Sequence, residues 1–172
     1  MIVTFAVGLC AGIFAAILVL IDGYLGLASW LGFVAMLSYY ATEGGKDGFM
    51  RSTFGNISGL AWGWVILALN TVLAGIPAPW GLAVIVIPVV VVMCLQSKWK
   101  LLSYTPGVFA GCSMLFAMLG AGDGIDGPSL YTKMFKVLIA IVVGNIGALA
   151  SQQIGVKWGT SMQKGAGETN KA

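Results

Sequence analysis

Long apolar stretches, separated by short polar or glycine-rich segments, make up most of the 172-residue chain. A helix needs about 20 apolar residues to cross a bilayer, and by that measure the pattern predicts six spans. The predicted spans are residues 2–21, 24–41, 53–73, 80–95, 101–119 and 137–153, with a turn at Asp22-Gly23 after the first. The fold class we expect is all-α: a polytopic transmembrane domain over residues 1–158, followed by a disordered cytoplasmic tail over residues 159–172.

The positions of the basic residues orient these spans. With six spans and the N-terminus inside, the outer loops receive only Lys133 and Lys136. The cytoplasmic side receives the other seven, which are Lys46, Arg51, Lys98, Lys100, Lys157, Lys164 and Lys171. Cytoplasmic loops of membrane proteins are enriched in Lys and Arg. We therefore expect both termini to lie in the cytoplasm.

Composition and missing residue types exclude several classes of function. Hydrophobic residues make up 59% of the chain and charged residues 9%, whereas soluble domains average about 45–50% and about 25%. The basic residues are scattered singly, so we expect no nucleic-acid partner. Histidine is absent, and the sequence has no metal-spaced ligand set, phosphate-binding glycine loop or nucleophile–base pair. We therefore expect no enzymatic activity, no cofactor and no metal site.

A weak internal similarity raises the possibility of a duplicated unit. Residues 55–61 (GNISGLA) resemble residues 144–150 (GNIGALA), in the third and sixth predicted spans. A repeat of three spans would place the two halves in inverted orientation, as in many transporters. A second similarity, between residues 37–40 and 102–105, implies a different register. The sequence therefore leaves a 3+3 inverted repeat open.

Glycines recur at the small-xxx-small spacing that allows membrane helices to approach closely. The glycines with this spacing are Gly55, Gly59 and Gly63, Gly8 and Gly12, and Gly107 and Gly111. Tight helix packing is the first interpretation. The alternative is a glycine face that borders a narrow pore.

A proline marks a break at the start of the fifth predicted span. Pro106 lacks an amide hydrogen and disfavours helix at Thr105, so the helix could begin only there, inside the membrane. Its free N–H groups, with the hydroxyls of Ser103 and Thr105, would then face a polar solute. Residues 41–45 form a second glycine-rich break. An ordinary helix start with a proline cap is the alternative.

Few polar side chains lie within the predicted spans, and none near a span centre is ionisable, which argues against proton coupling. Asn56 and Asn145 are the clearest, as contacts between helices or as solute ligands. Trp62 and Tyr104 are candidates for an aromatic constriction. The predicted substrate pathway comprises Ser103, Thr105, Pro106, Gly107, Asn56, Asn145, Trp62 and Tyr104.

Several segments resemble one family of small proteins. They are residues 93–97 (MCLQS), 101–111 (LLSYTPGVFAG) and 27–33 (LASWLGF), together with Gly44-Gly45. These segments are similar to the YcdZ-like family of small bacterial inner-membrane proteins, a domain of unknown function. The resemblance implies a multi-pass protein of the bacterial inner membrane and implies no activity.

These observations together favour a channel or facilitative transporter for a small, uncharged polar solute. Its expected partners are the lipid bilayer, that solute and further copies of the same chain. One alternative is a non-transporting membrane subunit that acts as a regulatory or assembly partner. A further alternative is a sodium-coupled transporter.

Overall fold

The computed structural model describes residues 1–25, 28–73, 75–76, 79–120 and 127–169. These residues form helices and no strand, which confirms the all-α class. The helices are α1 (Ile2–Leu25), α2 (Ser29–Tyr40), α3 (Gly45–Val72), α4 (Trp80–Leu95), α5 (Thr105–Gly120) and α6 (Gly127–Thr169). Two short 3₁₀ turns, η1 (Gln96–Lys98) and η2 (Lys100–Leu102), connect α4 to α5.

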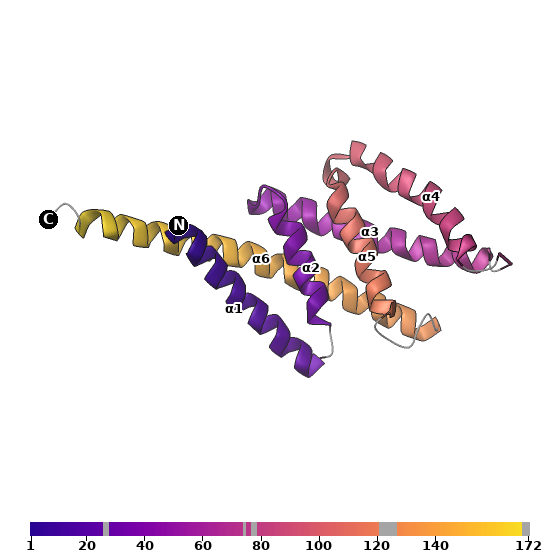
Figure 1. Cartoon of the computed structure of the whole chain (residues 1–172), viewed down its shortest axis with the longest axis horizontal. Helices are drawn as coiled ribbons and strands as arrows, with labels where there is room; N and C mark the ends of the chain where they lie inside the picture. The colour runs from indigo at the N-terminus through magenta and orange to yellow at the C-terminus, as the bar shows by residue number, and fades with distance from the viewer. Residues whose placement is uncertain (26–27, 74, 77–78, 121–126, 170–172) are drawn as a thin grey trace.

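Successive helices alternate in direction, and the two longest, α3 and α6, form the centre (Figure 1). Helix α1 lies along α6, α4 lies along the outside of α3, and α2 and α5 pack against the central pair. The start of α1 packs against the C-terminal half of α6, where Val3 contacts Gly159 and Val7 contacts Gly155. The α2–α3 and α4–α5 connections lie toward this same end (Figure 1).

Glycines set how closely these helices approach. A Cβ at Gly59 would lie 1.9 Å from the carbonyl oxygen of Val108, and one at Gly111 would lie 1.9 Å from that of Asn56. Gly55 and Gly63 also face α5, but less closely, because a Cβ there would lie 3.2 Å and 3.1 Å from its nearest neighbour. In the described part of the chain, however, a Cβ at Gly8 or Gly12 would meet nothing within 4 Å. The packing role predicted for those two glycines is therefore not met by another helix of this chain.

Among the described residues, four helices are long and apolar enough to span a membrane: Ile2–Tyr24, Gly45–Val72, Trp80–Lys98 and Ser129–Gly165. Thr105–Gly120 is apolar but shorter. Helix α2, with 12 residues, is about 18 Å long at 1.5 Å per residue. The predicted second span begins too early because α1 continues through Asp22-Gly23 to Leu25. The Asp22 carboxylate instead accepts a hydrogen bond from the Ala28 amide at 2.6 Å, before α2 starts.

Other helix ends also differ from the prediction. Helix α4 has the predicted bounds, with Pro88 inside it, whereas α3 starts eight residues early, at Gly45. Helix α6 continues to Thr169 instead of giving way to a disordered tail at Gly159. Gly159 packs against Val3 of α1, and residues 160–165 beyond it are exposed. Residues 170–172 of the predicted tail lie outside the described residues.

Candidate functional site

Buried polar side chains meet where α2 packs against α3. Ser38 is 5% exposed, and Ser52 and Asn56 are fully buried. The Ser52 hydroxyl donates to the Ser38 hydroxyl at 2.9 Å. With the amide oriented to satisfy both of its ends, Asn56 Nδ2 donates to Ser38 Oγ at 2.9 Å and to the Gly107 carbonyl at 2.8 Å. This serine–asparagine cluster (Ser38, Ser52 and Asn56) therefore joins α2, α3 and the first turn of α5.

Tyr104, in the connection before α5, contacts the backbone beside the serine–asparagine cluster. Its hydroxyl donates to the backbone carbonyl of Ser38 at 3.0 Å. Burial raises the pKa of the Tyr104 phenol above its ordinary value, so the group stays a neutral donor at physiological pH. A Cβ at Gly107 would lie 2.6 Å from the Tyr104 ring, so glycine is needed for this contact.

The glycine-rich break between α2 and α3 is tied to α6 by a second set of hydrogen bonds. The Tyr39 hydroxyl donates to Gln152 Oε1, and the Gly45 amide donates to the same oxygen at 3.0 Å. Gly44 and Gly45 have φ values of 76° and 67°, which lie in the left-handed region that favours glycine. The sequence predicted this break but not its contact with Gln152.

Two buried oxygens on α3 and α6 have no hydrogen-bond partner within the described residues. Asn145 is fully buried, and its Nδ2 donates to the Ile141 carbonyl at 2.9 Å. Its Oδ1 and the Oγ1 of Thr53 are both unpaired there. A buried polar atom without a partner is rare and calls for an unseen water, ion or ligand.

These two oxygens lie at a similar level of the molecule. Helices α3 and α6 are antiparallel, and Gly45 bonds to Gln152 across them. Thr53 lies eight residues after Gly45, and Asn145 lies seven residues before Gln152. At 1.5 Å per residue, these steps are about 12 Å and about 10.5 Å along the two helices. The unpaired oxygens are thus candidates for one shared site between α3 and α6.

The remaining predicted pathway residues are dispersed. Ser103 is exposed, and its hydroxyl donates to the Lys100 carbonyl at 2.9 Å. Thr105 is the first residue of α5, and Pro106 after it is exposed. The structure therefore unites Asn56, Tyr104 and Gly107, and leaves Ser103 and Pro106 at the end of the bundle.

Trp62 and Tyr104, the predicted aromatic constriction, have no hydrogen-bond partner in common among the described residues. The Trp62 indole donates to Gln96 beside α4, whereas Tyr104 bonds to α2. Trp62 follows Asn56 by six residues, which at 3.6 residues per turn places the two side chains on different faces of α3. The two aromatic rings therefore point to different neighbours.

Sequence reasoning missed four polar residues of these networks: Ser38, Ser52, Gln96 and Gln152. Ser52 precedes Asn56 by four residues, and Ser58 precedes Trp62 by four. Each pair lies on one face of a helix, and this spacing was the available signal. Gln96 and Gln152 carried no such signal, because each acts across a contact between distant segments.

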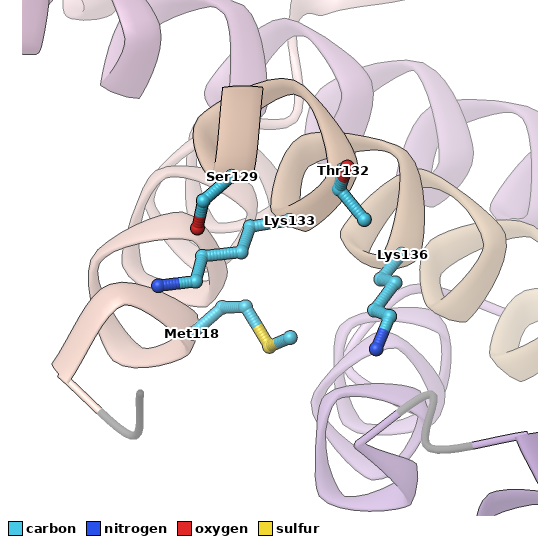
Figure 2. Close-up of a pocket in the computed structure, with 5 residues that line it drawn as sticks. All are labelled: Met118, Ser129, Thr132, Lys133 and Lys136. Carbon is cyan, nitrogen blue, oxygen red and sulfur yellow. The ribbon is translucent and has the colours of Figure 1, made fainter. Parts of the chain in front are cut away.

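A cavity of about 380 Å³ lies between the end of α5 and the start of α6. It is lined by Met118, Ser129, Thr132, Lys133 and Lys136. Figure 2 shows the two lysine side chains extending away from α6 on either side of Met118. This cavity lies at the opposite end of the bundle from Tyr104.

Comparison with known proteins matches residues 8–156 to the family described as "Protein of unknown function (DUF1097)". The uncharacterized protein YahC of Escherichia coli is 37% identical over 120 residues, which cover 64% of this chain and 70% of the relative. The inner membrane protein YcdZ of Salmonella typhimurium is 36% identical over 110 residues, covering 58% and 60%. YcdZ of Escherichia coli is 35% identical over 129 residues, covering 69% and 71%.

No solved structure is significantly similar to this chain. The family match covers most of the sequence, and two relatives are named as inner membrane proteins. Several long apolar helices agree with that location. The chain therefore belongs to the DUF1097 family of unknown function and is a multi-pass protein of the inner membrane.

Proposed function

We propose that this protein is a channel or facilitative transporter for a small, uncharged polar solute. The observation that carries the proposal is the pair of buried oxygens without a hydrogen-bond partner among the described residues, Asn145 Oδ1 on α6 and Thr53 Oγ1 on α3. Unpaired polar groups are costly inside a membrane protein, and they commonly mark solute pathways. A solute N–H or O–H group would satisfy Asn145 Oδ1, and Thr53 can donate as well as accept.

We also propose that six helices cross the membrane, with both termini in the cytoplasm. The alternating directions of α1 to α6 support this topology, as does the meeting of Val3 with Gly159. The basic residues Lys46, Arg51 and Lys98 lie in or beside the connections at that end. The short helices α2 and α5 would then lie at membrane depth among longer ones, where protein neighbours satisfy their ends.

A 3+3 inverted repeat would place the solute site between its two halves. In such a repeat α1, α2 and α3 correspond to α4, α5 and α6. The packing of α3 against α5 then corresponds to that of α6 against α2, and the packing of α4 against α3 corresponds to that of α1 against α6. A Cβ at Gly55 would approach the backbone of Gly107, and one at Gly144 would approach the backbone of Gly32.

Asn56 and Asn145 follow the equivalent glycines, so they would be related by the same pseudo-two-fold axis. Inverted-repeat transporters bind solutes at the repeat interface, near the bilayer midplane. Asn56 is satisfied by Ser38 and Gly107, whereas Asn145 keeps an unpaired oxygen. In this proposal Asn56 holds α2, α3 and α5 together, and Asn145 contacts the solute.

Proteoliposomes provide the test. Stopped-flow light scattering would follow the entry of urea, acetamide and glycerol into vesicles with and without the protein. We expect at least one solute to enter faster than in empty vesicles, at a rate that does not depend on a sodium or proton gradient. Equal rates for every solute would contradict the proposal.

A non-transporting subunit is the second candidate, and the open face around Gly8 and Gly12 favours it. Small residues on an unpacked helix face suit contact with another membrane helix. Purification at native expression separates the two functions, because a subunit would elute with a different protein. Uptake that requires a sodium gradient would instead favour the sodium-coupled transporter, with Asn145 and Thr53 as oxygen ligands.

A further inference from the structure

Gln96, at the end of α4, has an amide whose orientation is fixed by its neighbours. The residue is 5% exposed. Its Oε1 accepts hydrogen bonds from Ser58 Oγ and Trp62 Nε1, each at 2.9 Å. An indole nitrogen can only donate, so the atom facing Trp62 must be the amide oxygen. The amide nitrogen of Gln96 therefore points away from both partners.

That nitrogen, Gln96 Nε2, is buried and has no hydrogen-bond partner within the described residues. Leaving a buried donor unpaired lowers the stability of the folded protein. An acceptor from outside the chain would remove this cost.

Gln96 also lines a cavity of about 270 Å³ between α3 and α4. The other lining residues are Trp62, Val92, Leu95 and Trp99. Val92, Leu95 and Trp99 are 44%, 53% and 66% exposed, and α4 lies on the outside of the bundle (Figure 1). The cavity therefore belongs to the surface that faces the membrane and not to the α3–α6 contact.

The charges beside the cavity suit an amphiphile with an anionic head. Exposed Lys98 and Lys100 flank Trp99 in the sequence. Tryptophan side chains concentrate at the membrane–water interface, and basic residues there attract anionic lipids. A helix from a second copy would offer no comparable acceptor, because its backbone carbonyls are already bonded within that helix.

We propose that this cavity binds an anionic glycerophospholipid. An acyl chain lies against Trp62, Val92 and Leu95, the ester carbonyl accepts the hydrogen bond from Gln96 Nε2, and the head group lies near Lys98 and Lys100. The site is separate from the proposed solute pathway, so the lipid proposal can be tested whether or not the protein transports a solute.

Native mass spectrometry of the detergent-purified protein tests the site with phosphatidylglycerol in two forms. One form has ester-linked chains, and the other is its ether-linked analogue, which has the same head group but lacks the ester carbonyls. We expect the unaltered protein to retain the ester form at least about fivefold better, as one lost charge-neutral hydrogen bond of about 1 kcal/mol implies. Equal retention of the two forms would overturn the proposal, and this comparison needs no variant.

The variant Gln96→Leu then tests whether the preference for the ester-linked lipid comes from Gln96. This variant should bind the two forms equally and weakly, whereas Gln153→Leu, at an exposed position on α6, should keep the preference for the ester form. A preference that persists in a folded Gln96→Leu variant would place the lipid elsewhere and contradict the assignment. Circular dichroism and gel-filtration profiles establish that each variant is folded.

Discussion

Gly59 of α3 lies so close to Val108 of α5 that a Cβ on the glycine would be 1.9 Å from the Val108 carbonyl oxygen. Backbone atoms cannot move aside as a flexible side chain can. The two helices are therefore held at a distance that only glycine permits, and Asn56 reaches the Gly107 carbonyl across this contact.

Gly59→Ala should separate α3 from α5 and lower the stability of the folded protein. Overpacking of a tight contact costs about 1–3 kcal/mol, which should appear as a lower midpoint of thermal unfolding in detergent. Gly8→Ala is the matched control, because a Cβ there meets nothing within 4 Å in the described part of the chain. Equal destabilisation by the two changes would contradict the packing described for α3 and α5.

Tyr104→Phe should weaken the contact between α2 and the start of α5 without removing the ring. The change deletes the hydrogen bond from the phenol to the Ser38 carbonyl, worth about 0.5–1.5 kcal/mol. Chemical denaturation in mixed micelles would measure the loss. Tyr131→Phe, at an exposed position on α6, serves as the control and should leave stability unchanged.

Stability should be insensitive to pH across the neutral range. Burial raises the pKa of Tyr104 above its ordinary value, so its contribution is complete below about pH 10 and is lost as the pH rises through the raised value. The chain contains no histidine to titrate near neutrality. Unfolding midpoints should therefore agree from about pH 6 to about pH 9, and a step within that interval would contradict this account.

Single cysteines test the proposed six-span topology. Lys46→Cys, near the α2–α3 connection, should react with a membrane-impermeant maleimide only in inverted vesicles or permeabilised cells. Lys133→Cys, near the start of α6, should react in intact spheroplasts. The background should lack Cys10, Cys94 and Cys112, all of which are free thiols. Labelling of both positions from one side would exclude six spans.

The sequence predicted individual helices better than it predicted their neighbours. The apolar run at residues 80–95 has the bounds of α4, because polar residues follow it and Trp80 begins it. The sequence did not predict that α6 passes Gly159, because the contact of Gly159 with Val3 joins the two ends of the chain. Helices that are apolar on every face do not indicate which face meets which partner.

The candidate site was predictable only in part, for the same reason. Asn56 stood out as a polar side chain within a predicted span and Tyr104 as a candidate for an aromatic constriction. The structure brings both to a shared partner, Ser38. In the sequence, Gln96 stands out only as part of the segment that resembles the family. Its hydrogen bonds to Ser58 and Trp62 come from another helix and could not be predicted. The function of a side chain that acts between helices can be assigned only once it is known how those helices pack.

Solute flux through an Asn145 variant tests the central claim most directly. Asn145→Leu removes the unpaired Oδ1, and Ser113→Ala, at an exposed position on α5, is the control. For the solute that permeates best, we predict that Asn145→Leu reduces the rate at least about fivefold, in line with about 1–3 kcal/mol for a buried hydrogen bond, and that Ser113→Ala keeps the full rate. An unchanged rate in a correctly folded Asn145→Leu variant would contradict a solute site between α3 and α6.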